Sequence, residues 1–438
     1  MAELVIIGGG IVGLASALSA QRRGWRVRLV DRDFDGDRAS HGNAGGIAVS
    51  ECLPLSLRGL GLQPLRWLID PLGPLSVRAS YALRLLPWFR ALRAVSVPAR
   101  YQAIAKALAA LNDRSLADFR FLLGEIGLSG DLHTQGALTV YESTRTFQEE
   151  IEDWNLRRSL GVRWREVETE ELHVLEPNLS PVFERAVMLE DWAHIDDPKR
   201  IVAALRASVR ERGASLVTGE AIGLHAENGE KPAVLLDGGR RLEADRLLVA
   251  AGAWSDRLSR TIGDRALVES ERGYNTTLPQ NTGLLNREVI FAERKFVATP
   301  LSVGLRIGGA AEFAGLEAPA NFKRSDALLR LARRYLNNLD EHGCVRWMGQ
   351  RPTMPDSLPV ICASPRRPRV LYAFGHGHLG LTQAATTGEL IGHLLDGTPL
   401  PIDIAPYDIG RFARTAHNSV GRFDADVEGA GHAGGGGQ

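Results

Sequence analysis

The N-terminal residues alternate between short apolar runs of strand length and one longer apolar run of helix length. The pattern indicates a buried strand at Leu4 to Ile7, an apolar helix at Ile11 to Arg22 and a second strand at Trp25 to Val30. Gly24 stands where the helix should stop. Strand, helix and strand in this order predict one βαβ unit, whose two strands are parallel.

Beyond this unit the apolar spacing is first helical and then mixed. Residues 50–128 carry apolar positions three and four apart and are expected to be mostly helical. Later, short apolar runs bounded by glycines predict strands, and Asp197-Pro198 marks the start of a helix. Strands are expected at 136–141, 186–189, 214–218, 233–236, 241–243, 246–251 and 370–374 and within 266–311. Helices are expected at 146–160, 197–212 and 325–339 and, after a glycine turn, to about Leu395.

The composition narrows the class of protein. The chain has 438 residues, 44% of them hydrophobic, which is enough for two large cores or two interleaved domains. Lys and Arg total 52, as do Asp and Glu, so no overall charge favours a nucleic-acid partner. Cys52, Cys344 and Cys362 are odd in number and widely spaced, which argues against a disulfide framework or a zinc site. We therefore expect a cytoplasmic protein without a signal peptide or membrane span.

One arginine-rich segment leaves open whether the expected cytoplasmic protein also contacts a membrane. From Leu65 to Val97, apolar and aromatic residues alternate with arginines at helical spacing. Helices packed on the rest of the protein, with their arginines facing solvent, explain this pattern and are the favoured interpretation. The alternative is a basic, aromatic surface that rests on a bilayer, which would place the protein peripherally on the inner face of the cell membrane.

The first turn carries the strongest local motif. Gly8-Gly9-Gly10-Ile11-Val12-Gly13 follows a buried strand and opens a helix, the context in which G-x-G-x-x-G indicates a dinucleotide site. The first glycine permits the tight turn, the second lets backbone N–H groups approach a pyrophosphate, and the third lets helix and strand pack closely. Asp31 lies about 20 residues further on, where an acidic side chain can accept hydrogen bonds from ribose hydroxyls.

Units of strand and glycine turn recur along the chain, which predicts an α/β fold with a discontinuous Rossmann-like domain. Residues 1–50, 195–260 and 346–425 are expected to form this dinucleotide-binding domain. Residues 51–194 and 261–345 would form a mixed-sheet α+β substrate domain with a helical segment. The glycine-rich residues 426–438 are expected to be a disordered tail.

The glycine motif alone does not distinguish NAD from FAD, but two later segments favour FAD. Val249 to Trp254 ends a buried strand in small residues, which lets the backbone lie close to a cofactor. Gly375 to Thr382 precedes a helix, so free N–H groups and the positive end of the helix dipole could face a negatively charged ring edge. A reduced flavin carries such a charge.

Five segments together resemble the bacterial D-amino-acid dehydrogenases, members of the wider family of D-amino-acid oxidase-like flavoenzymes. In order and spacing they are Leu4 to Arg32, His41 to Gly46, Ala250 to Trp254, Trp347 to Asp356 and Gly375 to Leu381, so the resemblance spans nearly the whole chain. It implies FAD, bound in an extended form. The residues then expected to bind FAD are Gly8, Gly10, Ile11, Val12, Gly13, Asp31, Arg32, Asn43, Ala44, Gly45, Gly46, Ala251, Gly252, Trp254, Gly377, His378, Leu379, Gly380, Leu381 and Thr382.

The resemblance also implies the reaction, which is oxidation of a Cα–N bond by hydride transfer to flavin N5. Arg351 matches the arginine that holds the substrate carboxylate in the family, although it could instead be an ordinary salt-bridge partner. Tyr274 could close the pocket with its hydroxyl or be a packed tyrosine. His376 could hydrogen-bond flavin or substrate, or cap the turn from solvent. Arg351, Tyr274 and His376 are thus the candidate catalytic residues.

The sequence is compatible with several functions. The first is a dehydrogenase for a D-amino acid or cyclic imino acid, in a narrower version D-proline or cis-4-hydroxy-D-proline, that passes electrons to a quinone or other acceptor. The second is an oxidase of the D-amino-acid or glycine/sarcosine type that uses oxygen. A non-catalytic FAD-binding protein ranks lower because Arg351 is present. No metal site is expected, since His173, His194 and His225 lack close ligand spacing, and the oligomeric state is left open.

Overall fold

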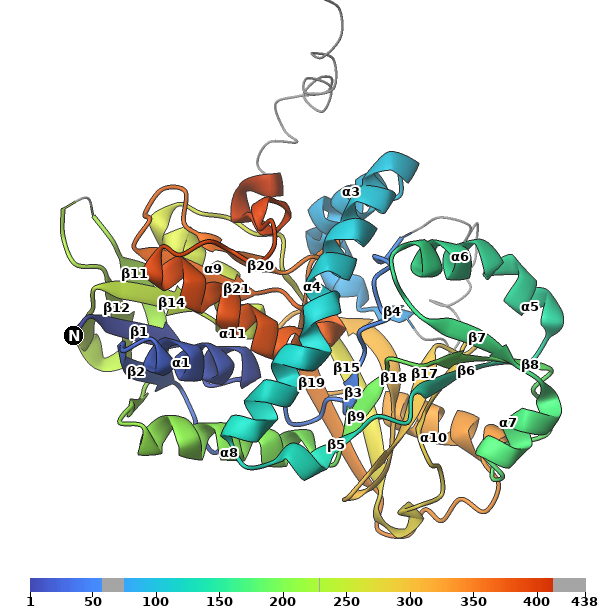
Figure 1. Cartoon of the computed structure of the whole chain (residues 1–438). Coiled ribbons are helices and arrows are strands. Elements are labelled where there is room, and N and C mark those ends of the chain that lie inside the picture. The colour runs from blue at the N-terminus through green and yellow to red at the C-terminus, as the bar shows by residue number, and fades with distance from the viewer. Residues whose placement is uncertain (57–74, 228, 413–438) are drawn as a thin grey trace, which may run out of the picture.

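A computed structural model of the chain describes residues 1–56, 75–227 and 229–412. The described residues form two lobes side by side, each built on its own large sheet (Figure 1). One lobe carries the N-terminal βαβ unit, and the long helix α4 (Pro98–Glu125) runs across the boundary between the lobes (Figure 1). The expected α/β fold with a second, mixed-sheet region is confirmed.

The sheet of the first lobe has six strands in the order β10-β2-β1-β14-β21-β20 within the described residues. All neighbouring pairs are parallel except β20 with β21. Both of its faces are covered, which is why the central strands β1, β14 and β21 are mostly apolar. These strands are β1 (Glu3–Ile7), β2 (Arg26–Asp31), β10 (Ser215–Thr218), β14 (Arg246–Val249), β20 (Val360–Ala363) and β21 (Val370–Phe374).

Alternate residues of β1 reach different cores. Leu4 and Ile6 pack with the helices on one face, and Val5 and Ile7 pack with a small antiparallel sheet on the other. The helices are α1 (Ile11–Arg22), α8 (Pro198–Glu211) and α11 (Gly380–Asp396), and the small sheet consists of β11 (Ala221–His225), β12 (Ala233–Leu236) and β13 (Arg241–Glu243).

The sheet of the second lobe is mostly antiparallel, with the order β19-β15-β18-β17-β16-β6-β8-β7 and β4 added beside β18 in the described part. Helix α10 (Lys323–Tyr335) covers its outer face. The strands are β4 (Leu75–Val77), β6 (Ala137–Tyr141), β7 (Trp164–Val167), β8 (Arg185–Leu189), β15 (Glu269–Leu278), β16 (Glu288–Phe291), β17 (Phe296–Leu301), β18 (Gly304–Phe313) and β19 (Val345–Thr353).

The register of β15 against β19 decides which side chains share a face. Glu271 pairs with Arg351, Gly273 with Gly349, and Asn275 with Trp347, so these three pairs lie on one face. Arg272 and Tyr274 point to the opposite face because strand side chains alternate, and the Tyr274 ring lies in the hydrophobic core behind the sheet.

Two segments lie elsewhere than the expected domain division places them. Strand β19 belongs to the sheet of the second lobe, although residues from 346 onward were assigned to the dinucleotide domain. Helix α4, assigned with the substrate domain, buries Leu108, Leu111 and Phe119 in the same core as α1 and α11. The apolar stripe of α4 predicted a buried face but not the partner of that face.

The expected helix at 146–160 is two helices in the structure. Ser143 caps the first, α5 (Thr144–Glu149), by accepting a hydrogen bond from Thr146 N at 3.2 Å, and α6 (Ile151–Ser159) begins after Glu150. The expected helix at 325–339 ends at Tyr335. The remaining short elements are α7 (Thr169–Leu175), α9 (Ser255–Ser259), β3 (Gly46–Ile47), β5 (Leu132–His133) and β9 (Ala193–Ile195).

The region expected to be helical over 50–128 contains strand β4 and a 3-10 turn before α3 (Leu86–Val95). Helix α3 buries Trp88, Leu92 and Val95, and its arginines face solvent. This is the packed-helix interpretation of the arginine-rich segment. Its first part, Leu65 to Ile69, and the expected disordered tail at 426–438 lie outside the described residues.

Candidate active site

A cavity of about 1080 Å³ lies between the two lobes and is lined by both sheets. The first lobe contributes the glycine turn after β1, the end of β2 and the segment after β14. The second lobe contributes parts of β15, β18 and β19. In an open α/β sheet, ligands bind beyond the carboxyl ends of the strands, and the cavity occupies that place.

Some glycines of the first turn are required by close packing, and others leave room for a ligand in the cavity. Gly8 has φ +116°, and a side chain there would put its Cβ 2.7 Å from the carbonyl carbon of Ala250. A Cβ on Gly13 would collide with the carbonyl oxygen of Gly8, so Gly13 sets the close approach of helix and strand. Gly10 is open, with Ser40 Oγ at 3.5 Å from an added Cβ. Gly8, Gly10, Ile11 and Val12 line the cavity.

The end of β2 also lines the cavity, and it is tied to the turn. One carboxylate oxygen of Asp31 accepts a hydrogen bond from Gly9 N at 2.6 Å, so Asp31 holds the glycine turn in place. The guanidinium of Arg32 lies over the Trp254 ring, 4.2 Å from its centroid. This contact joins the ends of β2 and β14, and Ala251 and Gly252 line the cavity beside it.

The loop at 42–46 forms the wall between the lobes. Asn43, Ala44 and Gly46 line the cavity, and the side chain of Asn43 accepts a hydrogen bond from Gly45 N at 2.8 Å. Gly45 lies behind this wall with φ +99°, and a Cβ there would come within 2.7 Å of Leu301. The small residues of this loop are therefore required by close packing as well as by access to the cavity.

The C-terminal turn brings a helix end to the same cavity. Five consecutive residues line the cavity at the start of α11, namely Gly377, His378, Leu379, Gly380 and Leu381. Thr382 lies one step behind, where its hydroxyl accepts a hydrogen bond from Ala48 N at 2.9 Å. That bond fixes the turn against the segment that follows β3.

His376 is a buried member of the wall, not a solvent-facing cap. It is 3% exposed, and its Nε2 lies 3.0 Å from the hydroxyl of Thr387. Burial lowers the pKa of His376 to about 3, so the imidazole is neutral at physiological pH. It can exchange hydrogen bonds inside the cavity but cannot carry charge there.

Arg351 lines the cavity and at the same time forms an ion pair. Its Nη1 lies 2.9 Å from Oε1 of Glu271 on the neighbouring strand. The other oxygen of Glu271 accepts a hydrogen bond from the Thr353 hydroxyl at 3.1 Å, and Nδ1 of His378 lies 3.6 Å from Oε1. Burial opposes ionisation of Glu271, but the positive charges of His378 and Arg351 outweigh it and lower the pKa of Glu271.

Tyr274 is a packed tyrosine. Its hydroxyl donates to Oε2 of Glu312 at 2.6 Å and accepts from Asn321 N at 2.9 Å, and the residue is 1% exposed. Although Tyr274 belongs to the cavity lining, the hydroxyl is held by these two partners. The structure therefore favours the alternative in which Tyr274 stabilises the sheet behind the site.

Sequence reasoning missed three polar residues of the cavity. Glu271 lies two positions before Gly273 on β15, and the period-two pattern of that strand was the signal that could have found it. Trp347 lies across Gly42 and Gly349, and among the described residues its indole N–H has no hydrogen-bond partner. Glu288 is a buried carboxyl on β16 that accepts a hydrogen bond from Trp192.

The described residues fit an extended dinucleotide. Gly10, the N-cap of α1, has no side chain to cap the helix. Ile11 N donates to Ser40 Oγ at 3.1 Å, which leaves the N–H groups of Val12 and Gly13, beside the open Gly10, for a pyrophosphate. Asp31, Arg32 and Trp254 belong to the lining of this cavity, as do the start of α11 and Arg351. Gly8, Gly10, Asp31 and residues 377–381 line this cavity and would hold FAD there.

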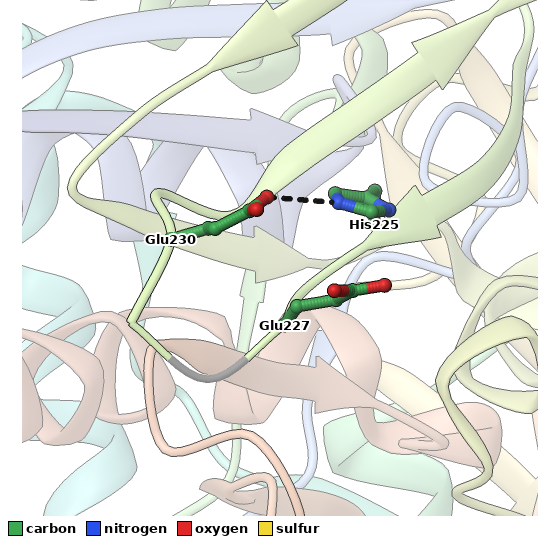
Figure 2. Close-up of side chains that lie close together, drawn as sticks. All are labelled: His225, Glu227 and Glu230. Carbon is green, nitrogen blue, oxygen red and sulfur yellow. Dashed lines mark hydrogen bonds and ion pairs between the residues drawn. The ribbon is translucent and has the colours of Figure 1, made fainter.

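A second group of polar side chains lies away from this cavity. His225, Glu227 and Glu230 come within 4.8 Å of one another through their ligand atoms, the one such group in the described part of the chain (Figure 2). His225 Nε2 lies 3.2 Å from Glu230, and both glutamates are exposed. Exposed acidic groups of this kind are common without a metal, and these three side chains do not belong to the lining of the cavity between the lobes.

Comparison with known proteins agrees with this geometry. The family model described as FAD dependent oxidoreductase matches residues 3–394. A protein named D-amino-acid oxidase from Bradyrhizobium diazoefficiens is 35% identical over 417 residues, covering 94% of this chain and 99% of that protein. A D-amino acid dehydrogenase from Rhizobium johnstonii is 27% identical, covering 94% of this chain and 100% of its own.

Solved structures show the same fold. Glycine oxidase from Geobacillus kaustophilus superimposes with a TM-score of 0.72 at 20% identity, covering 94% of this chain and 99% of its own. L-proline dehydrogenase from P. horikoshii superimposes with a TM-score of 0.71 at 20% identity, and the match covers 95% of this chain and 98% of the dehydrogenase. With the family match, the related sequences and the geometry of the cavity taken together, the chain belongs to the FAD dependent oxidoreductase family.

Proposed function

We propose that this protein oxidises the Cα–N bond of a D-amino acid or cyclic imino acid, whose carboxylate Arg351 binds. The observation that carries the proposal is the position of Arg351, which lines the cavity from β19 and shares the carboxylate of Glu271 with His378 of the turn before α11. A guanidinium suits a carboxylate because it offers two parallel N–H donors. The names of the Bradyrhizobium and Rhizobium relatives support an amino-acid substrate.

The residues of the chain supply orientation and a dry environment. FAD, when bound, supplies the hydride acceptor, its N5 atom. Arg351 holds the carboxylate so that the Cα–H bond is directed at the acceptor, and the neutral His376 adds no charge that would oppose departure of the hydride. The oxidised substrate is an imino acid, which water hydrolyses to a keto acid and ammonia or an opened ring.

A visible spectrum of the purified holoenzyme tests this proposal. Under anaerobic conditions, a panel of D- and L-amino acids, D-proline and cis-4-hydroxy-D-proline is added, and bleaching of the flavin is recorded. We expect bleaching by D-amino acids or cyclic imino acids. No bleaching by any member of the panel would overturn the proposal.

Arg351→Leu tests the carboxylate assignment within the same experiment. Loss of a desolvated charge pair costs about 2–5 kcal/mol, which corresponds to a rise in KM of about 30-fold or more. Arg346→Leu, on the same strand but outside the lining of this cavity and paired with Asp326, is the matched control for loss of an arginine in this strand. An unchanged KM in Arg351→Leu with FAD retained would remove the assignment.

The electron acceptor distinguishes two versions of the enzyme. We propose first a dehydrogenase that passes electrons to a quinone or other acceptor, and second an oxidase that uses oxygen, which the 35% identity to a protein named oxidase favours. Reduced enzyme is mixed with air-saturated buffer and, separately, with a soluble quinone. Rapid reoxidation in air identifies the oxidase, and reoxidation by the quinone alone identifies the dehydrogenase.

A quinone-reducing version would benefit from peripheral contact with a membrane. No helix in the described residues is long and apolar enough to cross a bilayer. Leu83 is 80% exposed and Leu86 46% exposed, beside the solvent-facing Arg84 and Arg90. We propose that this edge touches anionic lipid. Sedimentation with anionic liposomes should deplete the protein from the supernatant at low salt, and full recovery in the supernatant would contradict the contact.

A further inference from the structure

The cavity contains a buried negative charge directly beside the arginine assigned to the substrate carboxylate. Glu271 lines the cavity, and its side chain is 4% exposed. Its Oε1 faces Arg351 Nη1 at 2.9 Å, and its Oε2 accepts one hydrogen bond from Thr353 at 3.1 Å. A carboxylate offers about four acceptor positions, so Glu271 can accept a further donor from the cavity.

A site for a carboxylate alone would not be built in this way. The nearby negative charge of Glu271 cancels much of the attraction that Arg351 exerts on an anion. Burying a charged glutamate is also unfavourable unless it is paired. The arrangement therefore weakens the binding of a simple carboxylate and suits a ligand that carries both charges.

We propose that Glu271 binds the amino group of the substrate while Arg351 binds its carboxylate. An α-amino acid carries its ammonium and carboxylate on the same carbon, and the protein presents an anion and a cation 2.9 Å apart on adjacent strands. Each end of the zwitterion then meets the opposite charge, and the Cα between them is fixed at two points. This inference rests on the proposed function, since it takes an amino acid as the substrate.

The same contact determines specificity. Glu271 would discriminate against hydroxy acids and plain carboxylates, because these bring a negative charge beside Glu271 without a cation to balance it. It would also admit a secondary amine such as a cyclic imino acid, whose two N–H groups can still donate. His378, 3.6 Å from Glu271, is the other positively charged neighbour when protonated.

The competing explanation is that Glu271 only holds Arg351 in position. The two roles make different predictions for a ligand without an amino group. If Glu271 only orients Arg351, the loss of Glu271 should weaken the binding of an amino acid and of a plain carboxylate by the same factor. If Glu271 binds the amine, the loss of Glu271 should weaken the binding of the amino acid but not that of the plain carboxylate.

The experiment measures dissociation constants of the holoenzyme and of Glu271→Gln under anaerobic conditions. For the amino acid, the constant is taken from the saturation of the flavin bleaching rate. For the matched ligand, which lacks the amine, the constant is taken from the shift of the flavin spectrum. This ligand is propanoate for D-alanine, with hydrogen in place of the amino group, or cyclopentanecarboxylate for D-proline, with CH2 in place of the ring N–H. We expect Glu271→Gln to lose about tenfold or more in affinity for the amino acid. The variant should bind the amine-free ligand as tightly as the wild type does, or more tightly.

Control variants separate this effect from a change in the fold. Glu269→Gln lies on the same strand and accepts a hydrogen bond from Tyr81 at 2.8 Å outside the cavity lining, so it should bind both ligands as the wild type does. Glu271→Asp keeps the charge with a shorter reach and should restore part of the amino-acid affinity. If Glu271→Gln loses FAD, the comparison of the two ligands in Glu271→Asp carries the test.

The outcomes separate the two proposals. Failure of the proposed function appears in the wild type, as an enzyme that no amino acid bleaches. Failure of the inference appears only in the variants, when the wild type oxidises an amino acid and Glu271→Gln binds both ligands as before or loses both by the same factor. Selective loss of the amino acid supports the inference.

Discussion

The indole Nε1 of Trp192 donates a hydrogen bond to Oε2 of Glu288 at 3.1 Å, in the wall of the cavity. Glu288 is 3% exposed, and a side chain on Gly46 would collide with its carboxyl group. Burial raises the pKa of Glu288 from 4.5 to about 7, although the bond from Trp192 works in the other direction. The carboxyl thus titrates near neutral pH.

This raised pKa predicts a pH dependence of stability. Between pH 4.5 and 7 the unfolded chain has released the proton of Glu288 while the folded chain still holds it, so folding loses stability as the pH rises. The loss is on the order of 2–4 kcal/mol for a shift of this size. Glu288→Gln should remove it, so the thermal midpoint of the variant should exceed that of the wild type at pH 8. Equal midpoints at pH 5 and pH 8 in both proteins would contradict the assignment.

His376 predicts a loss of stability on the acidic side. Its pKa is about 3 in the folded protein and 6.5 ordinarily. Below pH 6.5 the unfolded chain therefore binds a proton at this histidine that the folded chain does not bind. Each pH unit in this window should cost about 1.4 kcal/mol. His376→Gln should therefore lose less stability than the wild type between pH 7 and 5, as measured by thermal denaturation. His342→Gln, an exposed histidine, is the control.

Gly10 should be needed for FAD but not for the fold. An added Cβ there meets Ser40 Oγ only at 3.5 Å, so a larger side chain is accommodated by the protein and projects toward the cavity. Gly10→Val should fold with a secondary structure like that of the wild type and be purified with little or no FAD. Gly130→Ala, where an added Cβ has no described atom within 4 Å, should keep its FAD. A yellow, fully loaded Gly10→Val protein would contradict this placement.

The thiols should differ sharply in reactivity. Burial raises the pKa of Cys52 to about 11 and that of Cys362 to about 12, whereas Cys344 is exposed. A thiol reagent should therefore label one cysteine quickly in the native protein and all three after unfolding. Loss of the fast label in Cys344→Ser identifies it. Fast labelling of two or three thiols in the native protein would show that the cores around Cys52 or Cys362 open readily.

Elements that depend on neighbouring residues were predictable from the sequence, and contacts between distant segments were not. The βαβ unit and the strand at 370–374 were predicted correctly because apolar period and glycine turns are local signals. The single helix expected at 146–160 was wrong because the chain breaks at Glu150, where α5 ends and α6 begins. The role expected for the hydroxyl of Tyr274 was not supported, because the alternation along β15 turns that side chain into the core.

The sequence by itself determined the dinucleotide fold, the glycine turn at Gly8 to Gly13 and Arg351 as a candidate, because each depends on neighbouring residues or on a motif. The tertiary structure decided which distant residues meet. Glu271 and Arg351 are 80 residues apart along the chain, and only the pairing of β15 with β19 places them on one face. Strand pairing between distant segments leaves little trace in a single sequence, so the partner of Arg351 became visible only in the fold.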